Sequence, residues 1–176
     1  MCTGNRFRSP LAAALLAERT RELPVAVTSL GTLELGPVPA LPEAVKIAES
    51  YGLDLSSHRA QSIAGVNLET WDLVVAFERM HMAAAVVDGG ARLEQTFTLP
   101  ELLDLLDALP EPSRQGEAMS RARARIQLAH SARPDEHRRN TVPEIADPLG
   151  RAPEVQRRIA EELRARVTEL SRRLFS

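Results

Sequence analysis

A cysteine, an arginine and a serine stand close together at the start of the chain, where Cys2, Arg8 and Ser9 give the spacing C-x5-R-S. Five intervening residues allow the backbone to curl so that successive N–H groups point inward and bind an anion. Gly4 and Asn5 suit such a curl because both tolerate positive φ angles better than branched residues do. An arginine offers a planar fork that matches two oxygens of a phosphoryl group. The spacing therefore predicts a phosphate-binding loop.

The same surroundings make Cys2 a candidate nucleophile. We expect Ser9 to be the N-cap of a helix and Pro10 to be its first residue. The N-terminus of a helix favours negative charge. Inward N–H groups, the helix end and a guanidinium all favour the thiolate over the thiol, and the thiolate is the form that attacks phosphorus.

The size and composition of the chain predict one domain over residues 1–176. The chain is 44% hydrophobic, which permits a real core, and its formal net charge of −2 gives no reason to expect nucleic acid or a membrane as a partner. The single cysteine excludes an intramolecular disulfide. We see no signal peptide and no apolar run of about 18 residues, and we therefore expect a cytoplasmic protein. The oligomeric state is not predicted.

Helices are expected to alternate with short buried strands along the chain. Strands are predicted at 25–29, 71–77 and 93–98, and helices at 10–22, 44–51, 79–87, 99–106, 115–131 and 155–174, with a polar loop at 133–150. This order is typical of an α/β fold with a three-layer, doubly wound parallel sheet of flavodoxin-like order. Ligands bind such sheets at the C-terminal ends of the strands, where the Cys2 loop would lie.

Several motifs, in their usual order, resemble those of the low-molecular-weight protein tyrosine phosphatase family, within an arsenate reductase-like superfamily. Residues 1–10, M-C-T-G-N-R-F-R-S-P, are similar to the signature loop V-C-x-G-N-x-x-R-S-P. The other similar segments are S-L-G-T at 29–32, G-L-D-L-S-S-H-R-A at 52–60, D-L-V-V-A at 72–76 and A-D-P-L-G at 146–150.

The resemblance implies a two-step mechanism that needs no metal or other cofactor. Cys2 would attack phosphorus, Asp147 would protonate the leaving oxygen and later deprotonate water, and Arg8 would stabilise the transferred group. The substrate would be a phosphorylated protein or a small phosphomonoester. The implied phosphate-binding residues are Thr3, Gly4, Asn5, Arg6, Phe7, Arg8 and Ser9, and the implied loop supports are Asn5, Ser9, Ser29 and His58.

The residue types of Asp147 and His58 also allow a purely structural role. Asp147 precedes Pro148, and an Asp-Pro pair often starts a turn. His58 could equally be a capping or surface histidine.

Two departures from the family pattern bear on the expectations. The run of apolar residues that leads into the family's cysteine is lacking before Cys2, so we expect the sheet to lack its first strand. Leu149 and Gly150 stand where the family often has aromatic residues, which weakens the expectation of phosphotyrosine but not that of a phosphatase.

An Arg-rich insertion is expected at about 110–140. The segment 114–139 carries seven arginines and no aromatic residue, which argues against stacking on nucleic acid. It is either a solvated face or a surface that attracts an acidic substrate.

The leading interpretation is a cysteine-dependent protein tyrosine phosphatase. One alternative is an arsenate reductase that uses an external small thiol, since this chemistry needs only Cys2. The other is a non-catalytic module, truncated at its first strand, that binds oxyanions or phosphoproteins.

Overall fold

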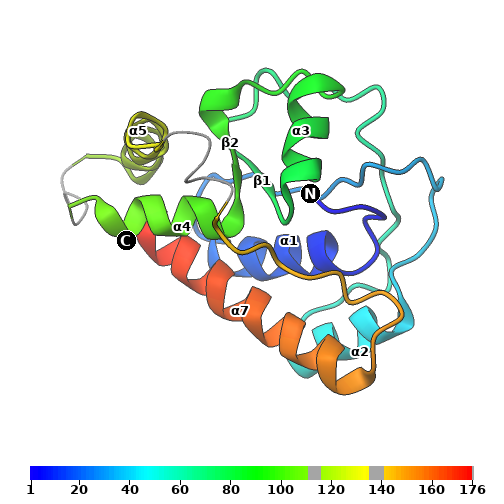
Figure 1. Cartoon of the computed structure of the whole chain (residues 1–176). Helices are drawn as coiled ribbons and strands as arrows, with labels where there is room; N and C mark the ends of the chain where they lie inside the picture. The colour runs from blue at the N-terminus through cyan, green and yellow to red at the C-terminus, as the bar shows by residue number, and fades with distance from the viewer. Residues whose placement is uncertain (111–115, 135–140, 176) are drawn as a thin grey trace.

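The computed structural model describes residues 1–110, 116–134 and 141–175 (Figure 1). Its elements are α1 (Arg8–Arg19), α2 (Pro42–Ser50), β1 (Val74–Ala76), α3 (Arg79–Val87), the 3₁₀ helix η1 (Leu93–Gln95), β2 (Thr96–Thr98), α4 (Leu99–Ala108), α5 (Ala118–Ser131) and α7 (Pro153–Phe175). All six predicted helices therefore have a counterpart. The bounds of α3 are the predicted ones, and those of the other five differ by a few residues.

The sheet at the centre of the fold is parallel. β1 pairs with β2, and the partners are Val74 with Thr96, Val75 with Phe97 and Ala76 with Thr98. Two isolated parallel bridges join Cys2 to Gly31 and Gly31 to Ser62. The predicted α/β class with a parallel sheet is confirmed. The predicted strand at 93–98 is wrong in its first half, because residues 93–95 form η1.

The predicted strand at 25–29 is also wrong, because this segment is extended but belongs to no ladder. Val25, Val27 and Ser29 are half-buried, whereas Ala26 and Thr28 are exposed. This alternation is the period of a strand, as the β-branched composition predicts. A strand is defined by a hydrogen-bonded neighbour, however, and among the described residues this segment has none.

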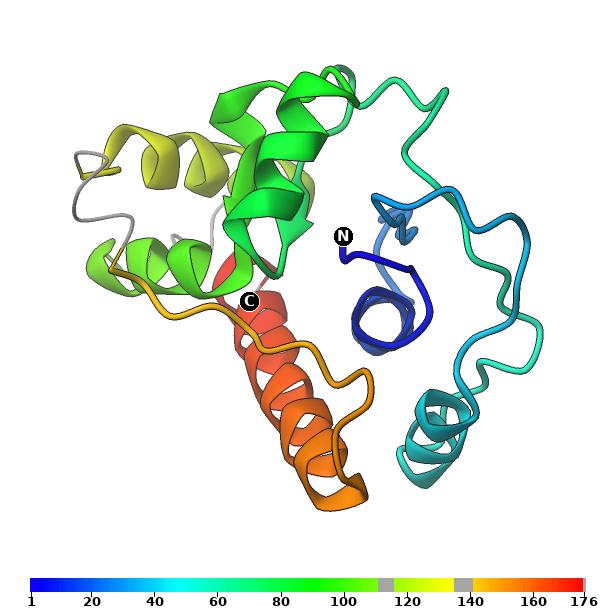
Figure 2. The ribbon, with the colours of Figure 1, turned by 45° about the vertical axis from the view of Figure 1, so that its right-hand side comes forward.

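The C-terminal helix α7 forms the longest face of the core. It packs against α1, α2, α4 and α5, and runs along α1 and α4 in Figures 1 and 2. Its buried apolar stripe consists of Ile159, Leu163, Val167, Leu170 and Leu174. They share one face of the helix because they recur at the helical period. In the described part of the chain, no helix is both long and apolar enough to cross a membrane.

The predicted Arg-rich insertion lies partly outside the described residues, since 111–115 and 135–140 are not described. Two of its described arginines hold neighbouring elements together. Arg125, which is buried, donates to the Pro110 carbonyl oxygen at 2.9 Å. Arg133 donates to Glu101 Oε1 at 2.9 Å, and its guanidinium lies 4.0 Å from the centre of the Phe97 ring. The extent of the insertion and the division into a single domain stay predictions.

Replacement of a core residue of α7 tests this description of the core. Leu163 is fully buried, so Leu163→Ala should lower the free energy of unfolding by about 2–5 kcal/mol, through lost burial and the cavity left behind. Leu149→Ala is the matched control, because Leu149 is 67% exposed, and should change it by less than about 0.5 kcal/mol. Urea denaturation gives both values, and equal effects would contradict the packing described for α7.

Candidate active site

The backbone of the loop between Cys2 and α1 turns its carbonyl groups toward the surrounding chain. The Thr32 N–H donates to the carbonyl oxygens of Cys2, at 3.1 Å, and of Thr3, at 2.9 Å. The Leu41 N–H donates to the Arg6 carbonyl oxygen at 2.8 Å. These bonds come from two segments distant in sequence, so the loop is held in its curled form by its neighbours.

The N–H groups of the same loop have no hydrogen-bond partner in the part of the chain that the structure describes. Across the described residues, the backbone N–H groups of residues 3–7 donate to no other group. The loop then runs directly into α1, which begins at Arg8, so the positive end of the helix dipole lies at the same place. Unpaired amides at a helix N-terminus form a site for an oxyanion such as phosphate.

Asn5 is the residue that fixes the shape of the loop. It is buried and has φ 52°, a left-handed conformation that asparagine tolerates. Its Nδ2 donates to the hydroxyl oxygens of Ser9 and Ser29, each at 2.8 Å, and its Oδ1 accepts from the Gln61 N–H at 2.8 Å. The His58 Nε2 lies 2.7 Å from the Asn5 carbonyl oxygen. The structure thus brings together all four residues that the resemblance assigns to loop support.

The Cys2 sulfur lies at the base of this arrangement. The side chain is buried, and its Sγ lies 3.0 Å from the Ser9 Oγ. The prediction that Ser9 caps α1 is wrong, because the N-cap position is Phe7 and no side chain caps the helix. Since α1 begins before Ser9, the Ser9 hydroxyl is free to bond with Cys2 and Asn5 instead.

Arg8 connects the loop with two segments far along the chain. It is 2% exposed, and its Nη1 donates to the Ile145 carbonyl oxygen at 2.9 Å and to the Glu78 carboxylate. Its Nη2 donates to Asp147 Oδ2 at 2.8 Å. The other Asp147 oxygen accepts from the Leu149 N–H at 3.0 Å, which is the Asx turn expected of an Asp-Pro pair. Asp147 is therefore both a turn residue and a neighbour of the arginine.

The guanidinium of Arg8 is partly occupied by protein oxygen atoms in this structure. Both terminal nitrogens already bond to oxygen atoms of the protein. An arginine has five N–H donors and these bonds use three of them, so the Nε–H and the second Nη2 N–H can still bind two oxygens of a phosphoryl group beside the Asp147 carboxylate. Asp147 is 45% exposed, so it has room to move, whereas Arg8 is enclosed.

The remaining predicted loop residues differ in what their side chains do. Thr3 Oγ1 hydrogen-bonds with Nε2 of His81 in α3, and the Arg6 Nε donates to the Pro39 carbonyl oxygen at 2.9 Å. The Phe7 side chain is buried in the core. A phosphate-binding role for Arg6, Phe7 and Gly4 would therefore use their backbone N–H groups.

The sequence analysis missed two residues near this site, Glu78 and His81. Glu78 follows Phe77 just after β1 and pairs with Arg8. His81 is fully buried in α3, and its Nε2 lies 2.9 Å from Thr3 Oγ1. A usable signal was present, since polar residues that directly follow a buried parallel strand lie at the edge of the sheet where ligands bind.

His81 is held in its neutral form. Burial is the largest cause that lowers its pKa, to about 4, and the positive charges of Arg8 and the N-terminal amino group act in the same direction. A neutral imidazole adds no charge to the loop. It positions the Thr3 hydroxyl through a hydrogen bond whose direction depends on the tautomer.

Gly31 is required by close approach of the backbone to this loop. A Cβ atom on Gly31 would lie 2.8 Å from the Thr3 carbonyl oxygen and 2.9 Å from the Asn5 nitrogen. Both are backbone atoms, so neither can move without a change in the loop. Within the S-L-G-T segment, Gly31 thus lets the loop backbone pack directly against the segment's backbone.

Comparisons with known proteins define the class. The family model described as low molecular weight phosphotyrosine protein phosphatase matches residues 1–118. The chain therefore belongs to the low-molecular-weight protein tyrosine phosphatase family. It is 40% identical over 79 residues to the protein named "Probable low molecular weight protein-tyrosine-phosphatase EpsP" of Ralstonia nicotianae. That match covers 44% of this chain and 52% of EpsP, so the chain spans about half the length of this relative.

Solved structures extend the likeness over nearly the whole chain. The low molecular weight protein tyrosine phosphatase of T. tengcongensis has a TM-score of 0.68 and 26% identity, over 96% of this chain and 92% of that one. The YwlE arginine phosphatase of Geobacillus stearothermophilus has a TM-score of 0.68 and 25% identity, over 97% and 86% of the two chains. The expected lack of a first strand is not borne out by these comparisons.

The contact at Gly31 gives a test of the loop geometry. Gly31→Ala should displace the Thr3 carbonyl or the Asn5 nitrogen and raise the Kd for inorganic phosphate at least about tenfold, which corresponds to about 1.4 kcal/mol. Thr32→Ala, one residue further, is the control, because its backbone bonds to the loop do not depend on its side chain. Isothermal titration calorimetry measures both variants, and unchanged phosphate binding by Gly31→Ala would contradict this role of Gly31.

The lowered pKa of His81 gives a test in stability. Between pH 6.5 and about 4 the unfolded chain binds a proton that the folded chain does not, so stability is lost as the pH falls through this range. From pH 7 to pH 5 the wild-type protein should lose about 2 kcal/mol more than His81→Gln does. Urea denaturation at the two pH values measures the difference. Equal losses, or an NMR titration of His81 near pH 6.5, would contradict the buried neutral state.

Proposed function

We propose that this chain is a cysteine-dependent phosphomonoester hydrolase that acts on phosphotyrosine in proteins. One observation carries the proposal: the curled loop holds Cys2 and its unpaired amides next to Arg8, and Arg8 in turn holds Asp147. A nucleophile, an anion site and a carboxyl group thus come from opposite ends of the sequence to one place. Membership of the phosphatase family supports the same chemistry.

In the first step the Cys2 thiolate would attack phosphorus in line with the leaving oxygen. The S–P bond forms, the P–O bond to the substrate breaks, and the leaving oxygen takes the proton of Asp147. In the second step the Asp147 carboxylate takes a proton from water, the water oxygen bonds to phosphorus, and the S–P bond breaks. Inorganic phosphate leaves, and both groups regain their starting forms.

Arg8 and the loop amides would stabilise the three equatorial oxygens while this charge moves. The contact between Arg8 and Asp147 gives a route into the reaction. A phosphoryl group that binds to the Nε–H and the second Nη2 N–H of Arg8 would lie beside Asp147, whose carboxyl group would then be near the leaving oxygen. Glu78 keeps its bond to Nη1 and holds the guanidinium in place.

The rim of the site supports an aryl substrate, but without aromatic stacking. Leu35 and Leu149 are both more than 40% exposed, and Leu35 lies against Gly4 of the loop. Leu149 is two residues from Asp147. Exposed leucines beside the anion site provide apolar contact for a phenol ring, in place of the aromatic residues that the family often has here.

Of the alternatives, the geometry favours hydrolysis over arsenate reduction. An alkoxide or phenolate leaves poorly without a proton, and this proposal gives that role to Asp147, whose contact with Arg8 supports it. A reductase that transfers its product to a small thiol has no such need. We further propose that the protein acts in the cytoplasm on phosphorylated proteins, as its single buried cysteine suits a reducing compartment.

Kinetics with two aryl phosphates tests the assignment. Cys2→Ser should abolish turnover. Asp147→Asn should lower kcat for phenyl phosphate about 10²–10⁴-fold, and much less for 2,4-dinitrophenyl phosphate, whose leaving group needs no proton. Asp104→Asn, an exposed aspartate of α4, is the matched control.

Three outcomes would contradict the assignment. Turnover by Cys2→Ser would exclude the cysteine mechanism, and equal losses on both esters would exclude Asp147 as the acid. Thiol-dependent release of arsenite without ester hydrolysis would favour the reductase. Peptides with phosphotyrosine, phosphoserine and phosphoarginine then separate the substrate classes, and phosphoarginine is included because a structural neighbour is an arginine phosphatase.

A further inference from the structure

The loop before α7 is fixed to the start of α3 just ahead of Asp147. We call residues 142–147 the acid loop, and Figures 1 and 2 show it in orange below α3. The Ile145 N–H donates to the Phe77 carbonyl oxygen at 3.1 Å, and the Ile145 side chain is fully buried. The chain is thus anchored two residues before the carboxyl group that bonds with Arg8.

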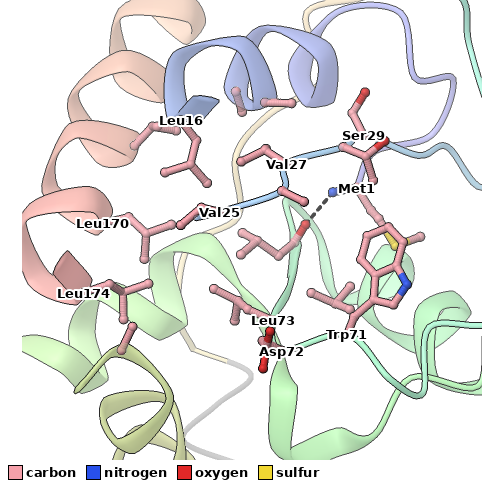
Figure 3. A pocket seen from close by; sticks show the side chains of 18 of the residues that line it. Met1, Leu16, Val25, Val27, Ser29, Trp71, Asp72, Leu73, Leu170 and Leu174 are labelled. Atoms are coloured by element: carbon pink, nitrogen blue, oxygen red, sulfur yellow. Dashed lines mark hydrogen bonds between the residues drawn. The ribbon is translucent and has the colours of Figure 1, made fainter. Parts of the chain in front are cut away.

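The end of β1 has distant partners at alternate residues. The Val75 carbonyl oxygen accepts from the Met1 amino group, beside an apolar pocket of about 690 Å³ (Figure 3). The Phe77 carbonyl oxygen, two residues further along, accepts from Ile145 of the acid loop. The acid loop therefore supplies the partner that lies nearest in sequence to Glu78, the residue that pairs with Arg8.

The start of α3 obtains its cap from the acid loop. The N-cap residue is Glu78, whose side chain makes no capping bond and pairs with Arg8 instead. The first N–H groups of a helix have no partner within the helix. Glu144 supplies one, because its Oε1 accepts from the Arg79 backbone N–H at 2.7 Å. A carboxylate in this place also gains from the positive end of the helix dipole.

The side chain of Arg79 turns back to the same loop. Its Nη1 donates to the Val142 carbonyl oxygen at 3.0 Å, and its Nε lies 3.3 Å from Glu144 Oε1. Glu144 thus faces both the backbone N–H and the guanidinium of one residue. Among the described residues, the Asp147 side chain itself bonds only to Arg8 and to the Leu149 N–H of its own turn.

We propose that Glu144, held by Arg79, is a positioning residue that sets where the Asp147 carboxyl group lies beside Arg8. The proposal rests on the role of Asp147 as the acid in the proposed function. One fixed residue, Ile145, leaves the chain free to rotate about it, whereas two neighbouring fixed residues set the direction in which it continues. An acid must lie within hydrogen-bond reach of the leaving oxygen, and a misplacement of about 1 Å can lower a rate about 10²-fold.

The bond to the helix N-terminus, more than the ion pair, carries this role. The Arg79 and Glu144 side chains are 43% and 31% exposed, and an ion pair between such groups is weak. The Arg79 N–H belongs to the backbone at the start of α3, and its bond to a carboxylate is charge-assisted. An uncharged oxygen acceptor at position 144 should therefore retain part of the effect.

Kinetics with two aryl phosphates tests the proposal. Glu144→Ala should lower kcat/KM for phenyl phosphate about tenfold, and less than about twofold for 2,4-dinitrophenyl phosphate, whose leaving group needs no acid. Glu144→Gln should lose less than Glu144→Ala, because its amide oxygen still accepts from the Arg79 N–H. Glu154→Ala is the matched control, since Glu154 also lies in the first turn of a helix and pairs with an arginine, but within α7, and it should change neither rate.

Hydrogen exchange gives a second readout that does not depend on catalysis. In Glu144→Ala the backbone amides of Arg79 and Ile145 should exchange at least about tenfold faster than in the wild-type protein, because the acid loop opens locally. In Glu154→Ala both amides should exchange at the wild-type rate.

Three outcomes would overturn the proposal. Unchanged exchange of both amides in Glu144→Ala would show that Glu144 does not hold the acid loop. Faster exchange without loss of activity on phenyl phosphate would show that the held loop does not position the acid. Equal losses on both esters in Glu144→Ala, with a selective loss in Asp147→Asn, would show that Glu144 does not act through Asp147.

The same measurements separate this proposal from the proposed function. If Asp147→Asn itself loses equally on both esters, the role of Asp147 as the acid is wrong. Exchange then decides the position of the carboxyl group alone: faster exchange in Glu144→Ala supports the hold on the acid loop, and unchanged exchange overturns it.

Discussion

The buried guanidinium of Arg8 is the constraint on which the site depends. A charged group that is 2% exposed is stable only if it is paired and hydrogen-bonded, and Arg8 obtains three partners from two distant segments. Glu78 comes from the end of β1, the Ile145 carbonyl from the loop before α7, and Asp147 from the same loop. Because these segments are distant in sequence, the one cation brings the start of α1, the edge of the sheet and the candidate acid together.

The anion site depends on which backbone groups of the loop are hydrogen-bonded to the rest of the protein. N–H groups of the neighbouring backbone donate to the loop carbonyls, and the Asn5 side-chain amide bonds with Ser9, Ser29 and Gln61. Among the described residues, the N–H groups of the loop itself stay unpaired and can bind an anion. Groups held in this way need no reorganisation when charge develops on a bound phosphoryl group, which is the main source of electrostatic stabilisation in such sites. Because Gly31 has no side chain, the backbone of Thr3 and Asn5 can approach it closely.

Cys2 links the site to the sheet. It carries the candidate nucleophile, and it is also paired through its backbone with Gly31. The loop therefore starts at a point that the backbone pairing with Gly31 fixes.

The sequence by itself determined what depends on short-range pattern. The C-x5-R-S spacing indicated which residues form the loop. The helical period of the apolar residues predicted the bounds of α3 and the buried face of α7, because neighbours on one helix face are set by local geometry. Tertiary structure decided the rest. The Ser9 hydroxyl bonds with Cys2 and does not cap α1, and segment 25–29 pairs with no strand. Arg8 forms its ion pairs with Glu78 and Asp147. These outcomes depend on which distant segments supply hydrogen-bond partners, and local periodicity carries no information about that choice.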